Sequence, residues 1–319
     1  MIKKIAVLTS GGDAPGMNAA LRAVIRAGLF NGFEMHVIYN GYKGLVDGDI
    51  HQVSKDFTAD IINRGGTIIK SARLPEFKNP EVVDLAIERL RDYDIDALVG
   101  IGGDGTYRGL LDLAKKGFPV VGIPASIDND VASTDYTIGF MTALGTICDC
   151  IDKIKDTSNS HQRCSIIEVM GRHCGDLAIY SSIAEGAELC LTAEHPYPEE
   201  RIFKKLRKMK AQKKGHAIVI VSENLLDVNE LGKKIEENTG FATNIEVLGH
   251  LQRGGAPTAF DRILASRMGE KAIDCLMKGE VGVVISSLNN DIVSVGIEEA
   301  LSMPRDTHES LIKLVKELQ

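Results

Sequence analysis

Two apolar strands follow each other closely in this chain, and each one ends in a polar loop that carries acids. Residues 97–101 read Ala-Leu-Val-Gly-Ile and lead into Gly-Gly-Asp-Gly-Thr at 102–106. After a helix-like run over 107–116, a second apolar segment at 119–123 leads to Ser-Ile-Asp-Asn-Asp at 126–130. Ligands of open α/β sheets bind at the carboxyl ends of the strands. The stretch therefore predicts a phosphate-and-metal site beside a carboxylate cluster.

The alternation of strands and helices indicates a parallel sheet. Residues 5–8 form a buried-strand pattern, a glycine-rich loop covers 9–16, and a helix is expected over about 17–30. Residues 41–44, Gly-Tyr-Lys-Gly, are typical of a turn. The second half repeats the alternation, which predicts two α/β lobes with a cleft between them.

Composition excludes several classes of function. The 319 residues are 44% hydrophobic and carry a net charge of −7, and Trp is absent, which argues against a broad nucleic-acid surface. No apolar window is long enough to cross a membrane. The apolar run near the start ends at Leu8, too short for a signal peptide, and the six cysteines form no CxxC pair. We therefore expect reduced thiols in a cytoplasmic protein.

The loop at 100–105 fits the pattern GxGxxG, for which a dinucleotide-binding loop is the alternative. Asp104 lies inside the loop, and its carboxylate would repel a bare pyrophosphate. The same carboxylate becomes favourable where Mg²⁺ bridges it to phosphate oxygens. The loop therefore suits a metal nucleotide better than NAD.

Asp128 and Asp130 follow the next strand, where they could simply be turn formers. Beside a magnesium carboxylate, one of them could accept the proton of an attacking hydroxyl. Basic side chains also recur at predicted strand ends, and guanidinium groups pair bidentately with phosphate. These are Arg73, Arg163, Arg172, His250 and Arg253. The residues alone thus predict phosphoryl transfer to a small phosphorylated hydroxyl compound.

Five ordered motifs resemble those of the bacterial ATP-dependent 6-phosphofructokinases (phosphofructokinase family A). They are LTSGGDAPGMNAA at 8–20, IGGDGTYRG at 101–109, IDND at 127–130, VMGRHCGD at 169–176 and LGHLQRGGAPTAFDR at 248–262. The resemblance implies a glycolytic enzyme that transfers the ATP γ-phosphoryl group to the 1-hydroxyl of fructose 6-phosphate. It also implies a cytoplasmic homotetramer that uses Mg²⁺, with ATP as co-substrate.

The resemblance implies two Rossmann-like three-layer lobes with mainly parallel sheets and an active-site cleft between them. We predict that residues 1–138 and about 253–307 form the ATP-binding lobe. Residues 139–252 and about 308–319 are then the lobe that binds fructose 6-phosphate.

Roles for individual residues follow from the same resemblance. Asp128 matches the general base, Asp104 the residue that positions Mg²⁺ of ATP, and Arg73 and Arg172 the remaining catalytic residues. The ATP-side positions are Gly12, Tyr42, Arg73, Leu74, Gly103, Asp104, Gly105, Thr106 and Gly109. The sugar-phosphate positions are Ser126, Asp128, Asp130, Arg163, Met170, Gly171, Arg172, Glu223, Asn244, His250 and Arg253, with Arg163 reaching the substrate of a neighbouring subunit.

Some positions depart from the family pattern. Asn244 stands where the family has a second interface arginine, Met141 replaces an Asp, and Asn224 replaces a Gly. The lost arginine predicts weaker substrate binding, since a charge-assisted hydrogen bond contributes about 1.5–3 kcal/mol. Gly105 and Ala125 are small and uncharged where pyrophosphate-using relatives have Asp and Lys, which favours ATP.

The family's effector site, which binds ADP or phosphoenolpyruvate, is matched by Arg22, Arg26, Lys155, Glu188, Lys214 and His216. Lys155 stands for an arginine, and Gln212 occupies a usually basic position, which predicts weakened or altered allostery. Two alternatives remain open at this stage: a pyrophosphate-dependent enzyme, and a regulatory paralogue with little catalysis.

Overall fold

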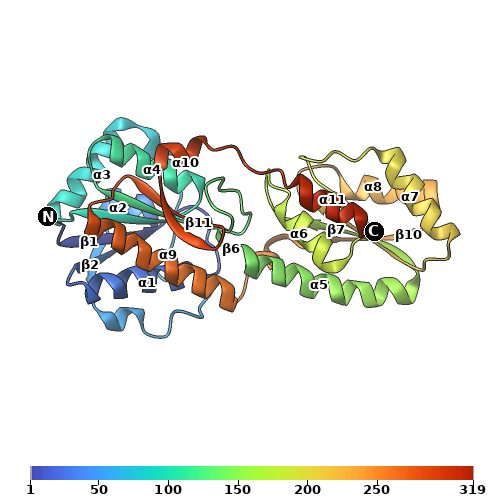
Figure 1. The fold of residues 1–319 in the computed structure, drawn as a ribbon, viewed down its shortest axis with the longest axis horizontal. Helices are drawn as coiled ribbons and strands as arrows, with labels where there is room; N and C mark the ends of the chain where they lie inside the picture. Colours follow the sequence, from blue (N-terminus) through green and yellow to red (C-terminus); the bar gives the residue numbers. More distant parts are fainter. Residues whose placement is uncertain (1, 319) are drawn as a thin grey trace. The chain divides into compact units, whose positions relative to one another are not determined.

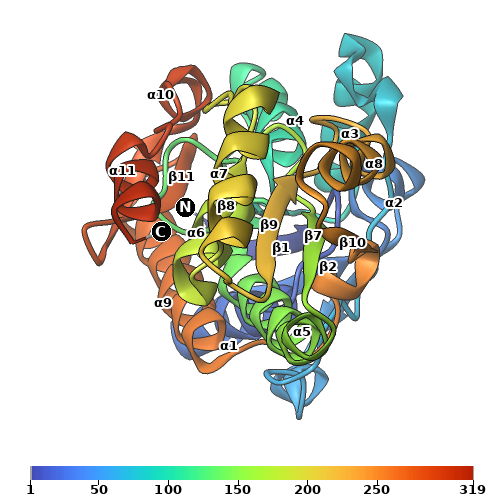
Figure 2. The same cartoon turned by 90° about the vertical axis from the view of Figure 1, so that its right-hand side faces the viewer.

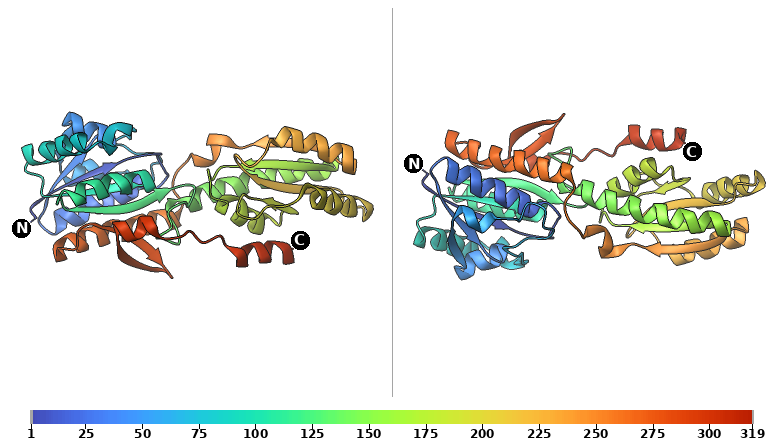
Figure 3. Two further views of the ribbon diagram at one scale, coloured as in Figure 1. Left: turned by 90° about the horizontal axis from the view of Figure 1, so that it is seen from above. Right: turned by 90° about the horizontal axis from the view of Figure 1, so that it is seen from below.

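The computed structural model describes residues 2–318 and divides the chain into two compact units. Unit 1 comprises Met1–Thr142 and Gly254–Arg305, and unit 2 comprises Ala143–Arg253 and Asp306–Gln319. Each unit has its own sheet, with helices on both faces (Figures 1 and 3). The predicted fold class, α/β with two largely parallel sheets, is confirmed.

The sheet of unit 1 follows the order β12-β11-β5-β4-β1-β2-β3, and β6 pairs with β5. Its inner strands are parallel, whereas β3 and β12, at the two edges, are antiparallel to their neighbours. The bounds are β1 (Lys4–Thr9), β2 (Glu34–Ile38), β3 (Ile50–Val53), β4 (Ala97–Gly102), β5 (Val120–Ser126), β6 (Ile138–Gly139), β11 (Val283–Leu288) and β12 (Asp291–Gly296).

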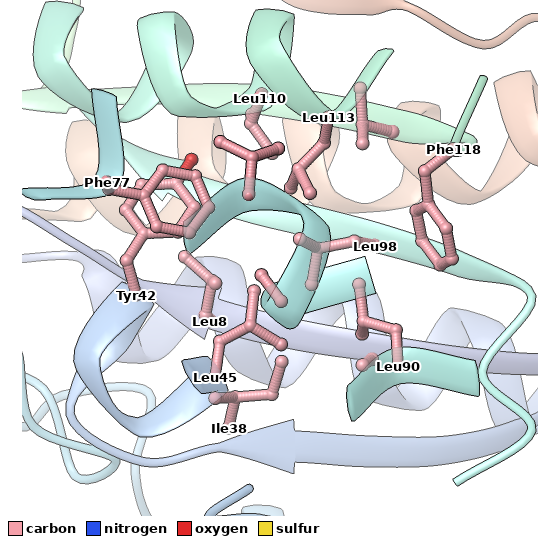
Figure 4. Packing of buried hydrophobic residues seen from close by; sticks show 14 of the residues in the cluster. Leu8, Ile38, Tyr42, Leu45, Phe77, Leu90, Leu98, Leu110, Leu113 and Phe118 are labelled. Atoms are coloured by element: carbon pink, nitrogen blue, oxygen red, sulfur yellow. The ribbon is translucent and has the colours of Figure 1, made fainter. Parts of the chain in front are cut away.

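The helices of unit 1 cover both faces of this sheet and pack against its apolar side chains. On one face, Leu8 and Leu98 of the strands pack with Leu45, Leu90 and Leu110 of three helices (Figure 4). On the other face, α1 and α9 approach so closely that a Cβ on Gly269 would lie 2.6 Å from that of Ala23. The helices are α1 (Met17–Phe30), α2 (Gly41–Asp47), α3 (Pro80–Asp92), α4 (Asp104–Lys115), α9 (Ala259–Lys278) and α10 (Ile297–Ser302), with 3₁₀ turns η1 (Lys55–Thr58) and η2 (Pro75–Lys78).

Unit 2 is built on a parallel sheet in the order β10-β7-β9-β8. Alternate residues of its strands form one apolar cluster with residues of α7 and α8. Both helices are labelled in Figure 2. Toward the other face, Ser165 of β7 bonds Ser158 of α5 at 2.5 Å. The elements are α5 (Phe140–His161, whose first residues belong to unit 1), β7 (Arg163–Val169), α6 (Asp176–Glu185), β8 (Leu189–Leu191), α7 (Glu199–Ala211), β9 (Ala217–Ser222), α8 (Val228–Thr239), β10 (Ala242–Val247), η3 (Gly249–Arg253) and α11 (Glu309–Glu317).

Two local predictions are wrong. The predicted turn at 41–44 is the start of helix α2, because Tyr42 and Leu45 lie three residues apart on one buried face. The helix expected over 107–116 begins at Asp104, so part of the predicted loop is the first turn of α4. Within residues 2–318, none of the helices combines the length and the apolar character needed to span a bilayer.

Candidate active site

The glycine turn after β4 places the first turn of α4 at the end of the strand. A Cβ on Gly102 would lie 2.2 Å from Oγ1 of Thr106 and 2.4 Å from the carbonyl oxygen of Ser10, so only glycine fits there. Thr106 is buried, and its hydroxyl donates to the Ser10 carbonyl at 3.2 Å. The free N–H groups of a helix start are suited to phosphate oxygens.

Space remains open beside this turn. A Cβ built on Gly12 or on Gly105 meets no atom within 4 Å, and both glycines are exposed. A Cβ on Gly103 would have only the Ala125 carbonyl oxygen near it, at 3.8 Å. The surroundings of these glycines can therefore accept a ligand without displacing protein atoms.

Asp104 is the acid of this turn. Its Oδ2 accepts hydrogen bonds from Nη2 of Arg108 at 2.9 Å and from Nε at 3.2 Å, and its side chain is 47% exposed. Among the described residues, no three His, Cys, Asp or Glu side chains converge as a metal cluster. A single exposed carboxylate fits Mg²⁺ that arrives with a nucleotide, because such ions keep several waters and take most other ligands from phosphates.

Tyr42 and Gly109 support α4 from the core side. Tyr42 is buried, stacks on Phe77 with 4.1 Å between ring centroids, and donates from its hydroxyl to the Thr106 carbonyl at 2.6 Å. A Cβ on Gly109 would lie 2.6 Å from the Tyr42 ring. Burial raises the pKa of Tyr42 well above its ordinary value, so the hydroxyl keeps its proton. These two residues therefore fix the helix start rather than offer open surface.

Arg73 and Leu74 lie in a loop that is tied to the first strand. The Ser71 hydroxyl donates to the Gly11 carbonyl at 2.6 Å, and that of Thr9 donates to the Lys70 carbonyl at 2.8 Å. Leu74 packs against the core, whereas Arg73 is exposed. The structure thus brings this loop beside the glycine-rich loop after β1.

The carboxylates after β5 are arranged around Ser126. Its hydroxyl donates to Oδ1 of Asp130 at 2.9 Å and accepts from the Asp128 backbone N–H at 3.2 Å. Asp128 is only 7% exposed, whereas Asp130 is half-buried. The two acids therefore have different environments, as expected for one base and one substrate-binding group.

Asn129, between the two acids, holds this loop. It is buried and has a φ of 53°, in the left-handed region that Asn tolerates. Its amide donates to the Asp135 carbonyl at 3.1 Å and accepts from the Thr137 N–H at 2.8 Å and hydroxyl at 3.2 Å. The Thr137 hydroxyl in turn donates to the Ser126 carbonyl at 2.6 Å. This residue was not predicted from the sequence, although an Asn in a strand-end loop is a signal for left-handed backbone.

In unit 2, Glu223 organises the loop after β7. Its Oε1 accepts from the N–H of Gly171 at 3.2 Å and of Arg172 at 2.7 Å, while both residues have positive φ. Gln252, fully buried and not predicted, accepts from the Met170 N–H at 3.0 Å and donates to the Gly249 carbonyl at 3.0 Å. The motifs at 169–176 and 248–262 thus meet at the carboxyl end of β7.

The remaining predicted residues lie around this loop or on β7 and β10. Arg172 and His250 are exposed and Arg253 is half-buried. Arg163, also exposed, begins β7, and Asn244 lies on the neighbouring strand, paired with Ser165. The Asn244 amide donates to Oε1 of Glu246 at 2.9 Å.

The predicted effector residues fall in both units. Arg22 and Arg26 share one face of α1, and Nε of Arg26 donates to the Thr58 hydroxyl at 2.9 Å. Burial and the charge of Arg26 lower the pKa of Arg22. In unit 2, Lys214 pairs with Glu188 at 2.5 Å, Lys155 pairs with Glu185, and His216 is half-buried.

Comparison with known proteins gives consistent matches. The family model described as Phosphofructokinase matches residues 4–276. The chain is 51% identical to the ATP-dependent 6-phosphofructokinase of Teredinibacter turnerae and 53% identical to that of Photobacterium profundum, each over 319 residues and all of both chains. The phosphofructokinase structure from Saccharomyces cerevisiae superposes with a TM-score of 0.88 at 33% identity, covering 99% of this chain and 47% of that one. A pyrophosphate-dependent enzyme from Marinobacter aquaeolei, 20% identical with a TM-score of 0.87 over 99% of this chain and 91% of its own, shares the fold.

Proposed function

The chain belongs to the phosphofructokinase family and is an ATP-dependent glycolytic kinase that phosphorylates fructose 6-phosphate. On this basis we propose which residues carry out the reaction. Asp128 is the general base that takes the proton of the sugar's 1-hydroxyl as that oxygen attacks the γ-phosphorus. The proposal rests on one observation above all: Asp128 is a buried carboxylate on a loop held by Ser126 and Asn129.

The nucleotide is bound by the glycine turns of unit 1. The open space at Gly12 and Gly105 and the N–H groups at the start of α4 support this assignment. Asp104 would hold Mg²⁺, and the bound ion would neutralise the negative charge of the phosphates. Arg73 and Arg172 neutralise the charge that develops on the transferring group.

Two sets of residues are assigned to the sugar phosphate. Ser126 and Asp130 contact it from the loop after β5, and the loop of unit 2 that Glu223 organises contributes Met170, Gly171 and Arg172. His250 and Arg253 supply charge for the 6-phosphate. Asn244, a neutral side chain engaged with Glu246, supports the proposal of weaker 6-phosphate binding than an arginine would give.

We further propose a homotetramer in which Arg163 contacts the substrate of a neighbouring subunit. The effector set from Arg22 to His216 would bind ADP or phosphoenolpyruvate with weakened or altered coupling, since Lys155 already pairs with Glu185. None of the six cysteines, all within the described residues, forms a disulfide, which supports a cytoplasmic location.

Replacing the base tests the mechanism. Asp128→Asn keeps the size of the side chain but cannot accept the proton, so kcat should fall by about 10²–10⁴-fold. The KM for ATP should change little, because Asp128 is not among the proposed nucleotide contacts. Asp84→Asn, which removes an exposed carboxylate paired with Lys116, is the matched control. A kcat within about tenfold of the unmodified enzyme would rule out Asp128 as the base.

A further inference from the structure

A cavity of about 260 Å³ opens inside unit 2, apart from every residue assigned above. It lies between the loop at 194–197, the start of α7 and helix α11. The buried apolar part of its lining is Cys190, Ile312 and Val315, none of which is more than 8% exposed. A concave site that combines apolar side chains with a few polar groups is the usual form of a small-molecule site.

The rim of the cavity is positively charged. Arg201 of α7 and Lys316 of α11 both line it, and within residues 2–318 neither takes part in an ion pair. Glu194 is the single acid of the lining, and its Oε1 accepts from the Gly175 N–H at 2.8 Å. Two cations and one engaged carboxylate favour an anionic ligand.

Both walls of the cavity contact the same two neighbouring residues, Gly175 and Asp176. Glu194, in one wall, binds the N–H of Gly175. His308, which caps the start of α11 in the other wall, lies with Nε2 3.2 Å from Oδ2 of the buried Asp176. His195 joins the walls, with Nε2 2.5 Å from the Thr307 carbonyl oxygen.

Gly175 and Asp176 end the loop that carries the proposed sugar contacts. The loop runs from Met170 through Gly171 and Arg172, and α6 begins at Asp176. A Cβ on Gly175 would lie 2.8 Å from both Glu194 and Thr192, so the loop end is packed directly against the cavity wall. A ligand that changes the spacing of the walls therefore acts on this loop.

We propose that this cavity is a second ligand site, which binds small organic carboxylates with an apolar body and thereby changes the affinity for fructose 6-phosphate. The carboxylate lies between Arg201 and Lys316, and the apolar body lies on Ile312 and Val315. At about 30 Å³ per water molecule, the volume suits a ligand on the order of ten non-hydrogen atoms.

Benzoate is the probe for binding, measured by isothermal titration calorimetry on the full chain. Saturable binding should be weakened at least about tenfold in Arg201→Gln/Lys316→Gln, which removes both charges. Lys313→Gln, on the same helix but paired with Glu317 outside the lining, is the matched control and should bind normally. Benzyl alcohol, with the ring but no charge, and inorganic phosphate, with charge but no ring, should both bind more weakly than benzoate.

Val315→Phe provides an independent check, because it fills the apolar part and leaves both cations in place. Its melting temperature establishes that the variant folds, and benzoate binding should then be lost. Benzoate that fails to saturate, or that binds equally well to the double variant or to Val315→Phe, overturns the site.

The coupling between benzoate binding and fructose 6-phosphate binding is measured separately. Benzoate should shift the KM for fructose 6-phosphate in the unmodified enzyme and not in the double variant. By linkage, fructose 6-phosphate should change the dissociation constant of benzoate in the same direction. Saturable binding with neither shift overturns the coupling through Gly175 and Asp176. Because binding is measured directly, a failure of the site is distinguishable from a failure of the catalytic assignments.

Discussion

At the scale of single residues, Gly105 sets what can approach the start of α4. The position is exposed, and a Cβ placed there would have no other atom within 4 Å. Its φ is outside the left-handed region, so other residues fit the backbone. An acid in the first turn of a helix is also favourable, by about 0.3–1 kcal/mol.

Gly105→Asp should therefore leave the melting temperature unchanged or slightly raised, while kcat/KM for ATP falls at least about tenfold. The cause is repulsion between the new carboxylate and the triphosphate. Gly105→Asn has nearly the same shape without the charge, so it should keep more activity than the Asp variant. Equal losses in the two variants would mean that space, rather than charge, selects the nucleotide.

At the scale of elements, the loop between β5 and β6 depends on Asn129. The side chain makes three hydrogen bonds to Asp135 and Thr137, and the backbone has positive φ. Asn129→Gly keeps the backbone conformation and loses the bonds, whereas Asn129→Ala loses both. A small displacement of a catalytic group costs on the order of 10²-fold in rate. We therefore expect kcat to fall by about 10–100-fold in the Gly variant and further in the Ala variant, with the KM for ATP little changed.

Asn290→Gly is the control for this pair of variants, because Asn290 also has positive φ but is exposed in the turn between β11 and β12. It should have normal kinetics. The steady-state kinetics and melting temperatures of the three purified variants test whether Asn129 positions Asp128. If Asn129→Gly retained the kcat of the unmodified enzyme, the amide would have no part in positioning Asp128.

The elements also show why the sequence predicts some features and not others. The parallel core strands β1, β4 and β5 are apolar runs bounded by glycine or polar loops, and the pattern alone identifies them. The edge strand β12 was not predicted, although Asn289 and Asn290 both have positive φ in the turn before it and an Asn pair signals such a hairpin.

The sequence predicts which residues form the candidate site, but it does not predict the contacts that support them. The motifs predict its chemical groups, because Gly, Asp and Arg have distinct roles at strand ends. The supporting contacts depend on distant partners: Gln252 binds the backbone of Met170, 82 residues away. No local pattern predicts such a contact, since it exists only once the two segments have folded together.

At the scale of the whole molecule, Asp261 fixes the chain where it passes between the units. The chain passes from one unit to the other after Thr142, after Arg253 and after Arg305, and Asp261 acts at the first of these passages. Asp261 is fully buried in the first turn of α9, and its carboxylate accepts from the N–H groups of Gly139 and Thr142 at 2.9 and 2.8 Å. The Thr142 hydroxyl donates to it at 2.5 Å. The start of α5 is thereby held on α9.

Asp261→Asn should lower the stability of unit 1 by about 1–3 kcal/mol, because one amide cannot accept all of these bonds.

The loss of stability in Asp261→Asn should depend on pH. Burial raises the pKa of Asp261 despite its hydrogen bonds, so the unmodified protein loses stability as pH rises from the ordinary Asp value through the raised one. The Asn variant lacks this loss, so the difference in melting temperature between the two proteins should narrow as the pH rises above the ordinary Asp pKa. Asp274→Asn, at a half-buried position of α9, is the control with the opposite sign. Lys278 lowers the pKa of Asp274, so any difference in melting temperature there should widen as the pH rises. A difference at Asp261 that widens with pH would show that the carboxylate is stabilised by its donors more than it is penalised by burial.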